Sequence, residues 1–89
     1  MITAVVLIKA EKGALPKLGE DLAAVPGVSE VYSVTGDIDF IAMVRAKEHD
    51  DLADIVTRRI AQVAGVAHTE THVAFKAFSK HDLETLFAP

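Results

Sequence analysis

The chain has 89 residues, of which 51% are hydrophobic, a formal net charge of −4 and no cysteine. The missing thiols exclude disulfide bonds, thiolate metal sites and a cysteine nucleophile, and the negative charge argues against a nucleic-acid-binding surface. The longest apolar run, Ala4 to Ile8, is too short to cross a membrane, and the start of the chain lacks the features of a signal peptide. We therefore expect a cytoplasmic protein with one domain over residues 1–80.

The spacing of apolar residues predicts six elements in chain order. Pro26-Gly27 is predicted to stop the first helix, and Asp50 to cap the second, which ends at Gly65. Residues 81–89 are expected to form a short helical tail. The six predicted elements are strand Ile2 to Ala10, helix Leu15 to Val25, strand Val28 to Thr35, strand Ile38 to Ala46, helix Asp50 to Val63 and strand Val66 to Phe78.

The sequence partly repeats itself at an offset of 38 residues (22 to 60). The stretch Leu22 to Val28 matches Ile60 to Val66, and the same offset aligns the first strand with the third. Two successive strand-helix-strand units are the simplest explanation. The expected fold is α+β, a ferredoxin-like βαββαβ sandwich with sheet order 4-1-3-2 and both helices on one face.

The two central strands of this sheet are apolar on both sides. One set of residues is expected to face the helices. The other set is more apolar than is usual for a solvent-exposed face: Val5, Leu7, Ile41 and Met43. An apolar centre between more polar edge strands is typical of a protein–protein interface. We predict a homodimer packed sheet to sheet; the alternative is an ordinary scatter of exposed apolar side chains.

Few residues point to catalysis by side chains. No serine lies in a nucleophile elbow, and the five glycines form no phosphate-binding loop. His68, Glu70 and His72 alternate along the last strand and face one side, as ligands of a divalent metal would. The favoured interpretation is the polar rim of an edge strand, so neither a metal nor a cofactor is expected.

The turn from Thr35 to Asp39 is the most distinctive candidate for a ligand-binding motif. Asp37 and Asp39 bracket Ile38 and so lie on one side of the chain. Carboxylates beside free backbone N–H groups suit a zwitterion such as an amino acid, although an ordinary Gly-Asp hairpin gives the same pattern. The hydroxyls of Thr69 and Thr71, opposite the histidines, could contribute, but threonine is also common in strands.

Four short motifs occur along the chain: Gly27-Val28, Thr35-Gly36-Asp37-Ile38-Asp39, Gly65-Val66 and Thr69-Glu70-Thr71. Together they resemble the ligand-binding domain of the Lrp/AsnC family of transcription regulators. The resemblance covers about residues 2 to 78. It implies the same βαββαβ fold, dimers formed through the sheet, and assembly into tetramers and octamers. It also implies that amino-acid effectors bind between dimers at Gly36, Asp37 and Asp39, with Thr35 adjacent and Thr69 and Thr71 supplied by a neighbouring subunit.

The chain departs from that family in two respects. It starts directly at the first strand, so the DNA-binding helix-turn-helix of full-length members is expected to be absent, and direct nucleic-acid binding with it. Ile38 stands where an aromatic residue is frequent, which leaves the preferred ligand side chain open. The resemblance implies a non-enzymatic sensor that acts through self-assembly or through a full-length regulator. The alternatives are a small monooxygenase-type enzyme and a purely structural oligomerisation subunit.

Overall fold

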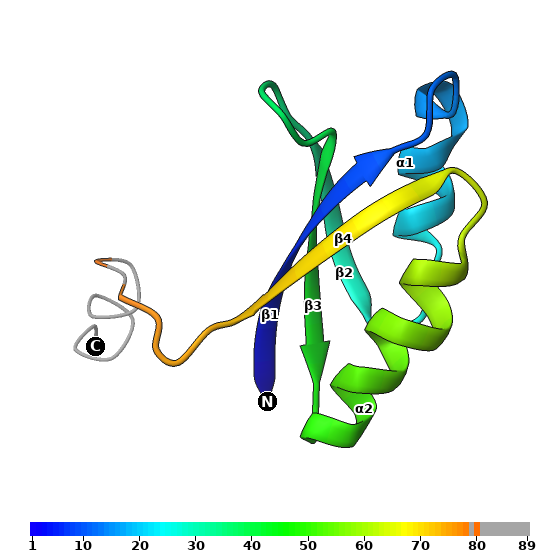
Figure 1. The fold of residues 1–89 in the computed structure, drawn as a ribbon. Helices are drawn as coiled ribbons and strands as arrows, with labels where there is room; N and C mark the ends of the chain where they lie inside the picture. The colour runs from blue at the N-terminus through cyan, green and yellow to red at the C-terminus, as the bar shows by residue number, and fades with distance from the viewer. Residues whose placement is uncertain (79, 81–89) are drawn as a thin grey trace.

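The computed structural model describes residues 1–78 and 80, so the predicted tail at 81–89 lies outside the described residues. Four strands and two helical segments follow one another in the predicted order (Figure 1). The second helical segment begins as an α-helix and continues as one π turn and one 3-10 turn. The elements are β1 (Ile2–Ala10), α1 (Leu15–Ala23), β2 (Val28–Ser33), β3 (Phe40–Ala46), α2 (His49–Asp54), η1 (Ile55–Arg59), η2 (Ile60–Gln62) and β4 (Val66–Val73).

The strands form one antiparallel sheet with the order β2-β3-β1-β4. This is the predicted order 4-1-3-2, counted from the other edge, and both helices cover the same face (Figure 1). β1 and β3 pair without a bulge from Ile2 opposite Ala46 to Ile8 opposite Phe40. The predicted ferredoxin-like α+β fold is confirmed.

The hydrophobic core lies between the helices and the sheet. Alternate residues of β1 and β3 point into it, because successive side chains of a strand leave opposite faces. Leu18 and Leu22 of α1 and Ile60 of η2 close it from the helix side and are almost fully buried. The buried strand residues are Ala4, Val6, Ile8, Phe40, Ala42, Val44 and Ala46.

The internal repeat is visible in the backbone. Gly27 and Gly65 have φ angles of 100° and 101°, a left-handed region that favours glycine. The residue after each glycine, Val28 or Val66, donates its N–H to the carbonyl three residues back, at 3.0 and 3.1 Å. Equivalent positions of the two halves therefore make the same turn between helix and strand.

Each of these glycines also bonds to the other half of the chain. The carbonyl of Gly27, in the first half, accepts the N–H of Arg45 in β3 at 3.1 Å. The carbonyl of Gly65, in the second half, accepts the N–H of Glu11, directly after β1, at 2.7 Å. The two βαβ units are thus linked reciprocally at their helix-to-strand turns.

The prediction that the last strand reaches Phe78 is wrong. β4 ends at Val73, which lies opposite Ala4 of β1, and the next residue, Ala74, donates its N–H to Thr3 at 2.9 Å. β4 is an edge strand whose one neighbour is β1. Because β1 itself begins at Ile2, little backbone remains with which a longer β4 could pair.

The second helix also differs from its prediction. It begins at His49, with the extended residue Glu48 at the N-cap, so Asp50 lies in the first turn instead of capping it. An acidic side chain in the first turn still suits the helix dipole. The π turn η1 has no counterpart in the prediction. In this turn the Ile60 N–H bonds to the Ile55 carbonyl five residues back, so the two isoleucines lie one above the other on one face of the helix, and both are buried.

No helix among the described residues is long and apolar enough to span a membrane.

Candidate functional site

The loop between β2 and β3 projects beyond the end of the sheet (Figure 1). It spans residues 34–39 and is closed by a hydrogen bond from the Val34 N–H to the Asp39 carbonyl at 3.0 Å. Gly36 at its tip has a φ of 106°, and a Cβ there would meet nothing within 4 Å. Thr35, Gly36 and Asp37 are exposed, so the tip is open to a ligand or to a neighbouring molecule.

Asp39 attaches this loop to the end of β1. Its carboxylate Oδ2 accepts the backbone N–H of Ala10 at 2.7 Å and lies 4.0 Å from the ammonium Nζ of Lys9. Its own N–H donates to the Ile8 carbonyl at 2.9 Å. The Asp39 side chain is 23% exposed. One of its two carboxylate oxygens already accepts a backbone N–H before any ligand binds.

Lys9 contacts the candidate site and was not predicted from the sequence. Its ammonium donates to the backbone carbonyl of Asp37 at 2.7 Å. The side chain therefore bridges from β1 to the tip of the loop and fixes the backbone there. The signal that could have found it is the antiparallel register of the first and third strands, because Lys9 follows Ile8 directly and Asp39 precedes its partner Phe40.

Asp37 keeps its carboxylate for other partners. The side chain is exposed, and within the described residues no hydrogen bond or ion pair engages its carboxylate oxygens. Asp37 and Asp39, treated as a pair in the sequence analysis, therefore have different surroundings: one is free, and the other is bound to β1.

A hollow of about 320 Å³ lies at the foot of the loop. Two lysines on its wall, Lys9 and Lys12, carry ammonium groups, while Asp39 and Glu11 carry carboxylates. The hollow thus offers partners for both charges of a zwitterion. Its lining residues are Lys9, Ala10, Glu11, Lys12, Gly13, Leu15 and Asp39.

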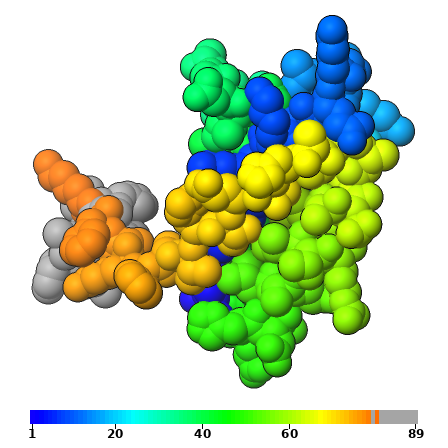
Figure 2. Space-filling model, viewed as in Figure 1, coloured from blue at the N-terminus to red at the C-terminus, as the bar shows by residue number. Residues whose placement is uncertain are grey.

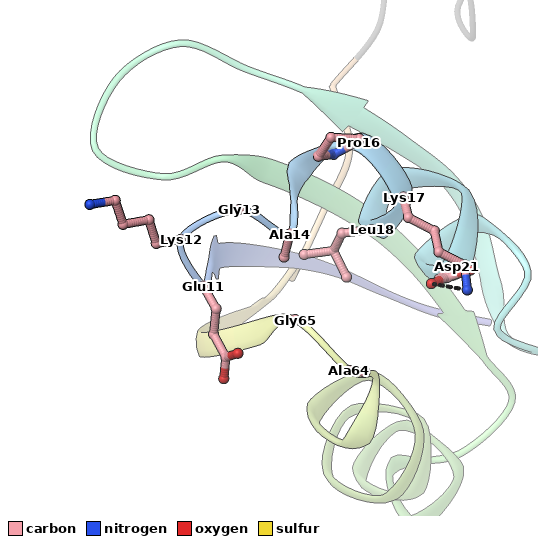
Figure 3. Close-up of a pocket in the computed structure, with 10 residues that line it drawn as sticks. All are labelled: Glu11, Lys12, Gly13, Ala14, Pro16, Lys17, Leu18, Asp21, Ala64 and Gly65. Atoms are coloured by element: carbon pink, nitrogen blue, oxygen red, sulfur yellow. Dashed lines mark ion pairs between the residues drawn. The ribbon is translucent and has the colours of Figure 1, made fainter.

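A neighbouring hollow of about 420 Å³ lies between the start of α1 and the turn before β4 (Figure 3). It shares Glu11, Lys12 and Gly13 with the first hollow. In Figure 3 the Lys12 side chain points away from it, and the Lys17 ammonium pairs with Asp21 at 3.9 Å. Both lysines of this second hollow are thus turned outward or already paired.

Thr69 and Thr71 lie apart from the loop. They pair with Ile8 and Val6 of β1, so their side chains are on the helix side of the sheet, with Thr69 half-buried and Thr71 exposed. The loop leads into β3, which pairs with the edge of β1 opposite β4. Within one subunit the structure therefore does not bring the two threonines together with Asp37.

His68, Glu70 and His72 are exposed on the helix-free face of the sheet. The His72 Nε2 lies 2.6 Å from the Glu70 Oε2, and His68 does not join this pair. Among residues 1–78 and 80, no group of three metal-binding side chains converges on one point. This arrangement is that of a polar rim.

The four apolar residues predicted to form a dimer interface lie together at the centre of the helix-free face. Val5 is opposite Met43 and Leu7 is opposite Ile41, and all four side chains are half-buried. Tyr32 on β2 borders this patch and is 50% exposed. Pairing through the patch remains a prediction, since the structure contains one subunit.

The sequence matches a model of the Lrp/AsnC ligand binding domain over residues 3–83. The chain belongs to the Lrp/AsnC ligand-binding domain family. This confirms the resemblance inferred from the glycine and Thr-Gly-x-x-Asp motifs. Within the Lrp/AsnC fold, the loop described above is the one that connects β2 and β3.

Individual relatives agree with this assignment. The crystal structure of TTHA0845 from Thermus thermophilus is 48% identical, with a TM-score of 0.82 over 90% of this chain and 100% of that one. An uncharacterized HTH-type transcriptional regulator of Pyrococcus furiosus is 37% identical over 82% of this chain and 51% of its own length. A feast or famine regulatory protein from M. tuberculosis, complexed with L-methionine, is 25% identical, with a TM-score of 0.75 over 89% of this chain and 53% of that one. The chain spans about half the length of the curated relatives it matches.

Proposed function

We propose that this Lrp/AsnC domain senses a small-molecule effector, an amino acid, at the loop between β2 and β3. The observation that carries the proposal is the free carboxylate of Asp37 at the tip of a loop whose backbone is fixed by Lys9 and Asp39. A fixed loop loses little conformational entropy when a ligand binds, so more of the contact energy appears as affinity. The methionine complex of the M. tuberculosis relative supports an amino acid as the ligand class.

The loop offers complementary partners for both ends of an amino acid. The Asp37 carboxylate can accept hydrogen bonds from the α-ammonium group, while the exposed backbone at Gly36 and the Lys9 ammonium, which lies 2.7 Å from the Asp37 carbonyl, can donate to the α-carboxylate. Charge-assisted hydrogen bonds of this kind are the stronger ones in proteins. The side-chain preference would then be set by what surrounds Ile38, the half-buried residue between the two aspartates.

The proposed output is a change of assembly. Thr69 and Thr71 lie across β1 from the loop, so they would reach a ligand from a neighbouring subunit and complete the site between dimers. An effector held between dimers favours the assembly in which its site is complete, by its difference in affinity for the two states. The partners would be further copies of this chain, as tetramers to octamers, or a full-length Lrp/AsnC regulator.

Calorimetry with each common amino acid, combined with light-scattering mass after size-exclusion chromatography, tests this proposal. We expect one amino acid to bind and to change the mass. Asp37→Ala should weaken that binding by about 10- to 100-fold, because a charge-assisted contact is lost. Asp50→Ala is the matched control: it removes an exposed aspartate from the first turn of α2, at the other end of the molecule (Figure 1).

Two outcomes would contradict the proposal. If Asp37→Ala and the unmodified chain bound the amino acid with equal affinity, the loop would not be the binding site. Failure of every amino acid to bind would favour a different effector or a structural oligomerisation subunit. We infer a regulatory role without catalysis, which agrees with a family defined by ligand binding. A monooxygenase of this type would need a histidine inside a cavity, whereas His68 and His72 on β4 are exposed and line none of the hollows described here. A haem titration tests this alternative.

A further inference from the structure

The second hollow, of about 420 Å³ beside Gly65, plays no part in the proposed amino-acid site. Its two borders are the turn between β1 and α1 and the turn before β4, which meet at the surface and are blue and yellow in Figure 2. The volume falls within the range of about 300–1,000 Å³ that is usual for small-molecule sites. The equivalent place in the other half of the internal repeat shows which chemistry suits this hollow.

The turn at Gly27, which is the counterpart of the turn at Gly65, is closed by an arginine. The Arg59 Nη1 donates to the carbonyl of Pro26 at 3.0 Å, and its Nε lies 3.3 Å from the Asp54 carboxylate. Pro26 lies just beyond the C-terminal end of α1, where the helix dipole and the last carbonyls attract a cation. A guanidinium group therefore occupies this place, held by a carbonyl and a carboxylate.

The same place beside Gly65 lacks an arginine. The repeat offset of 38 residues puts Asp21 where Arg59 stands (21 to 59) and Ala64 where Pro26 stands (26 to 64). Asp21 and Ala64 both line the hollow. A carboxylate cannot donate to a carbonyl, and the Ala64 oxygen accepts no side-chain hydrogen bond from residues 1–78 and 80. The hollow is thus the space that a guanidinium group fills in the other half.

The ion pair that borders the hollow is also the reverse of its counterpart. Along α1, Lys17 precedes Asp21 and lies 3.9 Å from it, whereas in the second helical segment Asp54 precedes Arg59. The π turn adds one residue between the latter two, so the pairs stand at equivalent places although their spacing differs. The position of a fixed cation in one half therefore carries a carboxylate in the other.

A second carboxylate on the wall of the hollow, that of Glu11, is free. It has no hydrogen bond or ion pair with the part of the chain that the structure describes, while the Glu11 N–H bonds to the Gly65 carbonyl at 2.7 Å. The Lys12 side chain points away from the hollow (Figure 3), and the Lys17 side chain is 82% exposed, so it can yield Asp21 to another cation. These charges favour a positively charged ligand.

We propose that this hollow binds a small molecule with a guanidinium group, at a site separate from the loop between β2 and β3. The cation donates to the Ala64 carbonyl and pairs with the carboxylates of Asp21 and Glu11. Ala14 and Leu18 on the wall of the hollow contact the apolar part of the ligand. Because the carboxylates are open to water, the affinity is modest, with a Kd of about 1 mM.

Titration of the full chain with methylguanidinium, followed by the amide chemical shifts in NMR spectra, tests this proposal. We expect saturable shifts at the amides of Ala14, Gly65 and Val66 and none at Gly36 in the loop. N-Methylurea, which has nearly the same shape and no charge, should produce no saturable shift. Equal shifts with methylurea, or no saturation at these amides up to about 50 mM, would overturn the proposal. Shifts confined to the loop around Gly36 would also overturn it.

Substitutions on α1 and on the turn before it should change the affinity in opposite directions. Glu11→Gln/Asp21→Asn removes both carboxylates and should raise the Kd for methylguanidinium by about 5- to 20-fold. Lys17→Met removes the competing ammonium group and should lower the Kd by about 2- to 5-fold. Glu20→Gln is the matched control, because Glu20 is an exposed carboxylate of the same helix that does not line the hollow. An unchanged Kd in the double variant would overturn the proposal.

The charge order of the other half can also be built into α1. In Lys17→Asp/Asp21→Arg the new arginine should fill the hollow, as Arg59 fills its counterpart, and abolish the response of Gly65 to methylguanidinium. Circular dichroism checks that this variant folds, and a response that persists in the folded variant would overturn the proposal. Light scattering of Asp21→Asn should show an unchanged mass. A lower mass would show that an arginine of a neighbouring copy, and not a small molecule, occupies the hollow.

Discussion

Asp39 joins the loop after β2 to the end of β1 with one carboxylate oxygen and one amide. The carboxylate receives the Ala10 N–H at 2.7 Å, and the Asp39 N–H donates to Ile8 at 2.9 Å. A two-sided link of this kind limits the freedom of the loop relative to the sheet. Asp39 therefore acts in the proposed site as a positioning residue, whereas Asp37 is the group free to touch a ligand.

Substitutions at the two aspartates should separate these roles in a urea titration. Asp39→Ala leaves the half-buried Ala10 N–H without its acceptor, which costs about 1–3 kcal/mol of the free energy of unfolding. Asp39→Asn keeps an acceptor oxygen and should cost less. Asp37→Ala, at an exposed side chain, should change the free energy by no more than about 0.5 kcal/mol. Equal losses in Asp39→Ala and Asp37→Ala would contradict this division.

Tyr32, the single tyrosine of the chain, reports on the helix-free face. A hydrogen bond with the Glu30 carboxylate raises the pKa of Tyr32, because it holds the phenol in its neutral form and opposes a second negative charge. Since the folded pKa lies above the unfolded one, the associated stability is complete below the ordinary tyrosine pKa. It is lost as the pH rises through the raised value.

An ultraviolet titration of tyrosinate tests this link. Glu30→Gln should lower the pKa of Tyr32 toward its ordinary value, because the neighbouring negative charge is removed. Glu70→Gln is the control: it removes the same charge from β4, at the far edge of the sheet. A titration curve that Glu30→Gln leaves in place would contradict the assignment.

At the scale of elements, glycine is required at two turns for partly different reasons. Gly27 needs a left-handed backbone, and a Cβ there would collide with the Ile55 side chain in the core. Gly36 has the same backbone requirement, with φ at 106°, but open space around it. The two positions therefore separate the cost of backbone strain from the cost of overpacking.

Gly27→Ala and Gly36→Ala should differ in thermal and denaturant unfolding. Gly36→Ala introduces backbone strain alone, which costs about 1–3 kcal/mol. Gly27→Ala adds a steric conflict with Ile55, which costs about 1–3 kcal/mol more. If both variants lost the same free energy of unfolding, the Ile55 side chain would have moved aside without cost.

The sequence predicts the elements better than their ends. Alternation and the 38-residue repeat (22 to 60) correctly predicted the order of strands and helices and the face on which the helices lie. The predicted last strand continues to Phe78, but β4 stops at Val73 because its neighbour β1 has ended. The limit of β4 is set by the register with another strand, which its own residues do not encode.

The same reason explains what was missed at the candidate site. Thr35, Gly36 and Asp37 were recognisable from turn chemistry, which is local. The contacts of Lys9 and of the Asp39 carboxylate join positions about thirty residues apart and follow from the pairing of β1 with β3. A prediction of side-chain roles there requires the register of the sheet first.

At the scale of the whole molecule, the apolar patch on the helix-free face should control association. Ile41→Lys places a charge at its centre, and desolvating that charge in a sheet-to-sheet pair should raise the dimer Kd roughly 100-fold or more. Leu15→Lys makes the same change of charge at an exposed position on the helix side. Light scattering measures both; a dimer that survives Ile41→Lys would place the interface elsewhere.

The reciprocal bonds of the two glycine turns have a consequence for how the domain comes apart. Gly27 of the first half holds the amide of Arg45, and Gly65 of the second half holds that of Glu11. Opening of either half removes the acceptor for an amide of its counterpart, so each turn couples the opening of one half to the loss of a bond in the other. We therefore expect the duplicated halves to unfold together, with similar hydrogen-exchange protection of the Arg45 and Glu11 amides; much weaker protection of one of them would show that its turn opens locally.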